Sequence, residues 1–90
     1  MRTPIIAGNW KMYKTPQEAV AFVNAVKDRL ANLTAVERVV CPPYVALPAV
    51  KAALEGTDIA VGAQDVHWEE EGAFTSQIAP GMLEGLATYV

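Results

Sequence analysis

Three short runs of apolar, often β-branched residues constrain the fold of this chain more than any other feature. They extend from Pro4 to Gly8, from Arg38 to Cys41 and from Asp58 to Ala63. Each run is continuous rather than alternating, which is typical of a strand covered on both faces, as in a parallel sheet. We therefore expect three buried parallel strands.

Helical patterns separate these runs. Thr15-Pro16-Gln17-Glu18 predicts a helix start, because Thr15 suits an N-cap, Pro16 suits the first helical position and Glu18 completes a capping box. Apolar residues then follow on one helical stripe, which consists of Ala19, Phe22, Val23, Val26 and Leu30. The pattern predicts an amphipathic helix.

Two further helices are expected. One spans about 46–55, with Pro48 in its first turn and Gly56 as a left-handed stop. Another spans about 80–87, although Gly81 and Gly85 lower its propensity. Residues 88–90 then resemble the opening of a fourth strand.

Alternating strands and helices predict an α/β fold with a parallel sheet and right-handed crossovers. The 90 residues correspond to one small domain, and no linker divides them. The connection from Gln64 to Ala79 is long for this architecture, which is typical of a functional or interaction loop.

Composition excludes several classes of protein. Apolar residues make up 52% of the chain and charged residues 19%, which indicates a globular protein. The net charge of −3 argues against a nucleic-acid partner, and no apolar run approaches the ~18 residues of a membrane span. No signal peptide is visible, and a single cysteine allows no internal disulfide, so we expect a cytoplasmic protein. One histidine and one cysteine also argue against a histidine- or cysteine-rich metal site.

Ligands of parallel α/β folds bind at the carboxyl ends of the strands. Lys11 lies just past the first strand, where its ammonium would hold a phosphate or stabilise an oxyanion; a solvated loop lysine is the alternative. Asn9 offers an amide at the same rim, or is simply a turn residue. Gln64 either orients these neighbours or only caps the third strand.

Other conspicuous residues have simpler interpretations. We expect His67 to be a surface histidine loosely paired with carboxylates, and Cys41 to behave as a small hydrophobe. Trp10 and Trp68 are expected to pack, and residues 69–71, three glutamates, to form a solvated loop.

Three motifs resemble triosephosphate isomerase in order and spacing, from residue 4 to residue 90. The first is Ala7-Gly8-Asn9-Trp10-Lys11-Met12, and the second is Val40-Cys41-Pro42-Pro43-Tyr44. The third combines Val61-Gly62-Ala63-Gln64-Asp65 with Glu71-Gly72-Ala73-Phe74-Thr75-Ser76.

The resemblance implies the N-terminal part of a (β/α)8 TIM barrel, about three βα units and the start of strand four, as one domain segment over residues 1–90. It implies interconversion of dihydroxyacetone phosphate and D-glyceraldehyde 3-phosphate through an enediolate, without a cofactor or metal, in a cytoplasmic homodimer. Asn9 and Lys11 would bind the substrate, Lys11 would be the electrophile, and Gln64 would support it. The loop from about residue 65 to 79 would dock into the partner subunit through Gly72, Phe74 and Thr75.

The chain also departs from the family pattern. A complete barrel takes about 250 residues, and the family's histidine in a Gly-His-Ser-Glu-Arg stretch, its glutamate base and its phosphate loops lie beyond residue 90. We therefore expect residues 1–90 alone to be inactive, with Val39, Val40, Ile59 and Val61 left uncovered. We also expect the isolated segment to be a loose monomer, an aggregate or a non-native oligomer rather than the family's dimer. The alternative is a non-catalytic α/β module that makes protein–protein contacts through its acidic loop.

Overall fold

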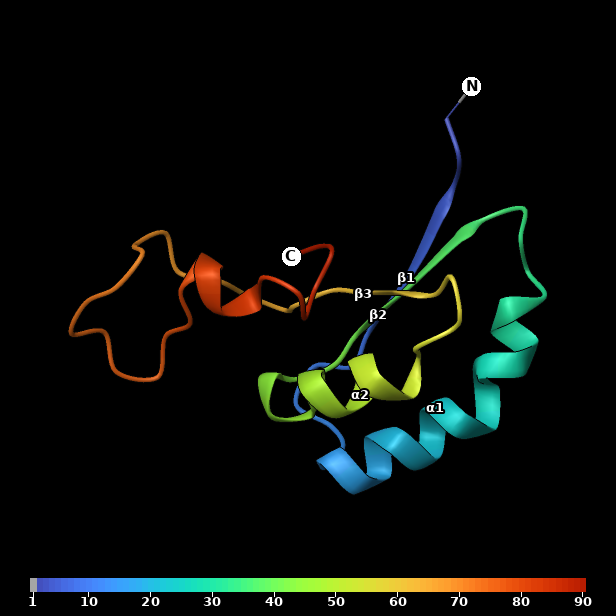
Figure 1. The fold of residues 1–90 in the computed structure, drawn as a ribbon, viewed down its shortest axis with the longest axis horizontal. Helices are drawn as coiled ribbons and strands as arrows, with labels where there is room; N and C mark the ends of the chain where they lie inside the picture. Colours follow the sequence, from blue (N-terminus) through green and yellow to red (C-terminus); the bar gives the residue numbers. More distant parts are fainter. Residues whose placement is uncertain (1) are drawn as a thin grey trace.

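A computed structural model describes residues 2–90 as a parallel sheet with helices on one side (Figure 1). The strands are β1 (Ile5–Asn9), β2 (Glu37–Cys41) and β3 (Ala60–Val61), in the order β1-β2-β3. The helices are α1 (Pro16–Ala31) and α2 (Leu47–Ala53), with short 3-10 helices η1 (Tyr44–Ala46) and η2 (Pro80–Leu83). In Figure 1, α1 and α2 lie side by side below the strands, and the orange loop before η2 extends away from them. The parallel α/β architecture is confirmed.

The strand register continues beyond β3 toward a fourth strand. Val39 of β2 lies opposite Ala60, and Val40 lies opposite Val61. On the far side of β3, Gly62 and Tyr89 form an isolated parallel bridge, and the Ala63 N–H donates to the Tyr89 carbonyl at 2.9 Å. The expected opening of a fourth strand is therefore confirmed.

The first helix begins as its sequence predicts. The Glu18 N–H donates to Thr15 Oγ1 at 3.2 Å, and the Thr15 N–H donates to Glu18 Oε1 at 2.9 Å. This reciprocal capping box satisfies two N–H groups that have no partner inside the helix. Ala19 and Val23 of the apolar stripe are buried, whereas Phe22 remains partly exposed.

The core lies between the helices and the outer face of β2 and β3. Its members come from α1, α2, the strands and η2, and include Ala19, Val23, Val40, Leu47, Val50, Leu54, Ile59, Val61 and Leu83. The expectation that Val39, Val40, Ile59 and Val61 are uncovered is wrong, since each is at most 8% exposed. Val40, Ile59 and Val61 pack in the core with the two helices and η2, whereas Val39 is buried on the other face of the sheet, beside Gly62.

The expectation of three buried strands is wrong for β1, which is exposed along its whole length. Ile5 is 51% exposed and Ile6 is 64% exposed. β1 is an edge strand that pairs only with β2, while the helices pack mainly over β2 and β3. The run of apolar, β-branched residues thus predicts the strand correctly, but it does not predict whether the strand is buried.

The two later helices are shorter than expected. The second divides into η1 and α2, and the third consists only of the four residues of η2. Gly85 has a φ of +80°, and Glu84 already has extended backbone angles, so the helix cannot continue to residue 87. Gly56 has the predicted left-handed conformation, with a φ of +82°, although α2 already ends at Ala53. Within residues 2–90, no helix is long and apolar enough to cross a bilayer.

Candidate functional site

Lys11 follows β1 in an unusual backbone conformation. Its φ is +55°, a left-handed value that few non-glycine residues adopt. Asn9 stabilises this turn, because its Oδ1 accepts the Lys11 N–H at 2.9 Å. The Trp10 N–H between them donates to the Cys41 carbonyl at 3.1 Å. The turn is therefore anchored to β2, and strain of this kind is typical of functional positions.

Gln64 connects the ends of all three strands. Its Nε2 donates to the Lys11 carbonyl at 2.9 Å and to the Cys41 carbonyl at 2.8 Å. One amide at the end of β3 thus holds the segments that follow β1 and β2. Of the two interpretations of Gln64, this geometry favours the orienting one over the capping one.

An open hollow of about 470 Å³ lies at this rim. Its lining includes Asn9, Lys11 and Gln64, so the structure brings together the three residues that the sequence singles out. Tyr44 and Asp65 also line it, and the Tyr44 hydroxyl donates to the Asp65 carbonyl. Burial, with a smaller contribution from the Asp65 carboxylate, raises the pKa of Tyr44, which keeps this donor protonated.

Tyr44 and Asp65 were not singled out as site residues by the sequence. A signal existed for both, since each follows the carboxyl end of a predicted strand, where ligands of parallel sheets bind. The hollow combines the ammonium of Lys11 and the side-chain amide of Asn9 with the carboxylate of Asp65. The Gln64 amide and the Tyr44 hydroxyl already donate to backbone carbonyls. The ammonium and the Asn9 amide suit a phosphate or a developing oxyanion.

His67 and Trp68 are neighbours on the long loop. The His67 ring is stacked on Trp68 and Phe74, and Nδ1 accepts the backbone N–H of Glu69 at 3.0 Å, while Glu69 and Glu71 line the same small hollow as the ring. Trp68 is 83% exposed, because its loop extends away from the core, whereas Trp10 packs against the core and Phe22 as expected.

Cys41 lies partly buried at the end of β2. Burial raises the pKa of its thiol, which keeps it protonated and unreactive at neutral pH. Residues 69–71 are exposed, as expected for a solvated acidic run.

The loop residues expected at a subunit interface are exposed. Gly72, Phe74 and Thr75 lie on the loop that Figure 1 shows extending away from the sheet. Gly72 has a φ of +152°, and an added Cβ would lie 2.6 Å from the Phe74 ring. Glycine is therefore required for Phe74 to occupy its position beside His67.

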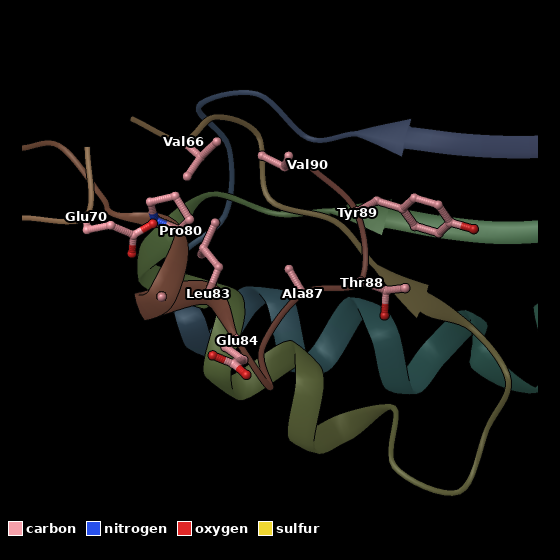
Figure 2. A pocket seen from close by; sticks show the side chains of 10 residues that line it. Val66, Glu70, Pro80, Leu83, Glu84, Ala87, Thr88, Tyr89 and Val90 are labelled. Carbon is pink, nitrogen blue, oxygen red and sulfur yellow. The ribbon is translucent and has the colours of Figure 1, made fainter. Parts of the chain in front are cut away.

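A second hollow, of about 460 Å³, lies beside η2 and the last residues of the chain (Figure 2). Glu70 and Glu84 line it together with Val66, Leu83 and Tyr89, and its lining contains no basic side chain. Two carboxylates make this hollow a poor anion site. The rim beside Lys11 is thus the better candidate for function.

Comparison with known proteins identifies the family. The model of the family described as triosephosphate isomerase matches residues 4–90. A triosephosphate isomerase from Carboxydothermus hydrogenoformans is 56% identical over 86 residues, and one from Clostridium perfringens is 59% identical over 86 residues. Each alignment covers 96% of this chain and 34% of the relative.

A solved structure supports the same assignment. A crystal structure of triosephosphate isomerase from Bartonella henselae superposes with a TM-score of 0.85 at 30% identity, covering 96% of this chain and 35% of the other. This chain spans about a third of the length of the relatives it matches. Its three parallel strands and their helices match the N-terminal part of a TIM barrel, and the chain belongs to the triosephosphate isomerase family.

Proposed function

We propose that this chain is the N-terminal segment of a triosephosphate isomerase, and that the complete protein interconverts dihydroxyacetone phosphate and D-glyceraldehyde 3-phosphate. The observation that carries the proposal is the position of Lys11. The Lys11 N–H donates to the Asn9 side chain, and the Lys11 carbonyl accepts a hydrogen bond from the Gln64 side chain. These two hydrogen bonds hold the Lys11 backbone at the rim of the hollow.

In this proposal Lys11 is the electrophile. Negative charge grows on the substrate oxygen as an enediolate forms, and a fixed ammonium stabilises that charge more than it stabilises the neutral carbonyl. Asn9 contributes an amide for binding, and Gln64 is a positioning residue. The reaction moves a proton between adjacent carbons, so it needs no cofactor.

Substitution of Lys11 in the complete protein tests the assignment. Lys11→Met retains the length of the side chain and removes its charge, so we expect kcat to fall by at least about 100-fold, on the scale of one lost oxyanion contact. Lys14→Met is the matched control, because Lys14 is exposed, also has a positive φ, and its ammonium lies over the Phe22 ring outside the hollow. If the kcat of Lys11→Met stayed within a few-fold of the parent's, Lys11 would not be the electrophile.

We further propose that residues 1–90 alone are inactive. A base and a second electrophile each contribute about 10²–10⁴-fold to proton transfer, and the family resemblance places both beyond residue 90. A coupled assay of the purified segment checks this point. The non-catalytic α/β module remains the alternative, and a stop codon after the codon for Val90 would favour it.

We propose that the complete protein is a homodimer that acts in glycolysis and gluconeogenesis in the cytoplasm. The exposed loop with Gly72, Phe74 and Thr75 supports the proposed homodimer, because the loop carries apolar and polar side chains, well away from the core, that a second subunit could contact. Neither nucleic acid nor membrane has a part in this proposal.

A further inference from the structure

Lys11 is held in place through its backbone rather than through its ammonium. Within residues 2–90, the structure gives this ammonium no hydrogen bond or ion pair. The Lys11 φ of +55° is a strained value for a residue with a side chain, so neighbouring groups have to stabilise it. The Asn9 side chain accepts the Lys11 N–H, and Gln64 Nε2 donates to the Lys11 carbonyl. The position of the charge therefore depends on where Gln64 lies.

Gln64 is itself held through the residue that follows it. The Tyr44 hydroxyl donates to the carbonyl of Asp65, which comes directly after Gln64. Tyr44 begins η1, just past β2, so this hydrogen bond joins segments that lie 21 positions apart in the sequence. Gln64 Nε2 also donates to the Cys41 carbonyl, at the end of β2. Two hydrogen bonds thus fix Gln64 to the end of β2, one through its side chain and one through its neighbour's backbone.

Tyr44 is a rigid support for this contact. It follows two prolines, of which Pro42 is fully buried. The Ala46 N–H donates to the Pro43 carbonyl at 2.9 Å, and Ala46 is fully buried as well. The Tyr44 ring packs against the core. A group that supports a reactive side chain acts best from such a fixed element, because its own position does not vary.

We propose that Tyr44 is a positioning residue for Lys11 and acts through the Asp65 carbonyl and the Gln64 side chain. The Tyr44 hydroxyl holds the start of the long loop, and Gln64, at that point of the loop, holds the Lys11 carbonyl. The Lys11 backbone in turn sets where the ammonium lies in the hollow. Tyr44 neither binds the substrate nor moves a proton in this proposal, which rests on the proposed function of Lys11.

Tyr44→Phe in the complete protein removes the hydroxyl and keeps the ring. We expect kcat to fall about tenfold, because a small displacement of a reacting group is costly even when its cause lies outside the chemistry. Tyr89→Phe is the matched control, since the Tyr89 hydroxyl also donates across the sheet, to Glu37 at the end of β2 that lies opposite the hollow. Tyr89→Phe should lower the free energy of unfolding but change kcat by less than about twofold, because that end of parallel strands serves stability. If Lys11→Met lowers kcat but Tyr44→Phe does not, or if Tyr89→Phe lowers kcat as much as Tyr44→Phe, the proposal is overturned.

The double variant Tyr44→Phe with Lys11→Met separates positioning from direct contact with the substrate. If Tyr44 acts only through Lys11, its hydroxyl has nothing left to position once the ammonium is gone. Tyr44→Phe should then lower the kcat of Lys11→Met by less than about twofold. An undiminished loss of about tenfold in this background would show that Tyr44 acts independently of Lys11, and would overturn the proposal.

Amide hydrogen exchange of Lys11 tests the geometry without relying on catalysis. The Lys11 N–H donates to Asn9 Oδ1 at 2.9 Å, so a loosened turn should exchange this proton faster. We expect faster exchange in Tyr44→Phe than in the parent and in Tyr89→Phe. Unchanged exchange in Tyr44→Phe would overturn the positioning role. Faster exchange in Tyr44→Phe, together with a kcat of Lys11→Met close to the parent's, would support that role and refute the proposed electrophile instead.

Discussion

Among single residues, Gly62 is closely packed by the side chains around it. An added Cβ would lie 2.9 Å from Cys41 Sγ, 3.4 Å from Val39 Cγ1 and 3.5 Å from Tyr89 Cβ. Two of these atoms belong to neighbouring β2 and one to the segment that pairs beyond β3. Glycine at this position therefore permits side chains on both sides of β3 to approach each other.

Gly62→Ala should destabilise the complete protein by about 1–3 kcal/mol, because the new methyl group overpacks this face. Gly81→Ala is the control, since its nearest neighbour would be a flexible Glu70 oxygen at 3.9 Å. Urea unfolding of both variants measures the difference. Adding Cys41→Ala should restore part of the loss, and a failure to do so would show that the sulfur is not the obstacle.

Arg38 is a buried charged residue whose hydrogen-bond partners decide how much it contributes to the free energy of unfolding. It is 4% exposed, and its guanidinium donates to the Leu33 carbonyl and to the Asp58 carboxylate. Asp58→Ala should cost about 1–3 kcal/mol, because a buried charged donor loses its acceptor. Glu55→Ala removes an exposed pair with Lys51 and should cost about 0–1 kcal/mol. Equal free energies of unfolding for the two variants would contradict this ranking.

At the scale of secondary-structure elements, the start of α1 depends on pH. Hydrogen bonds from the Thr15 backbone and side chain lower the pKa of Glu18 below its usual 4.5. A lowered pKa in the folded state means that charged Glu18 stabilises the helix above about pH 4.5, and that this contribution is lost as the pH falls through the lowered value.

Glu18→Gln should therefore reduce the loss of stability between about pH 5 and pH 3, because glutamine retains a capping acceptor but does not titrate. Thermal unfolding of the parent and the variant at both pH values measures this difference. Gln17→Glu is a useful control, since it adds a carboxylate at a neighbouring exposed position outside the capping box. An unchanged pH profile in Glu18→Gln would show that the box does not contribute in the folded protein.

At the scale of the whole molecule, β1 is an open edge. Its N–H and C=O groups pair only with β2, and Ile5 and Ile6 are exposed. Exposed apolar edge strands promote pairing between chains. An apolar groove of about 300 Å³ between β1 and α1, lined partly by Ile6, Trp10 and Phe22, adds to this surface.

We therefore expect isolated residues 1–90 to be a loose monomer, an aggregate or a non-native oligomer. Sedimentation over a series of concentrations tests this expectation. Ile6→Lys should reduce association, because a charge on an edge strand opposes pairing, whereas Leu33→Lys, at an exposed position outside the strands, should change it little. A sharply melting monomer at every concentration would contradict the prediction.

Sequence alone determined the features that depend on near neighbours. The capping box at Thr15 and Glu18, the left-handed Gly56 and the alternation of strands and helices are all present in the structure. Each arises from contacts within a few residues or from the conformational range of one residue. The rim position of Asn9 and Lys11 follows from the same alternation, because parallel strands share a carboxyl edge.

Only the tertiary structure decided which segments are buried and which side chains meet. β1 carries the pattern of a buried strand but is exposed, because burial depends on what packs against it. Gln64 reaches the Lys11 carbonyl across 53 positions of sequence, and the His67 ring meets Phe74 through the course of a loop. The first contact depends on how distant segments are placed in space and the second on the irregular course of a long loop, and local patterns encode neither.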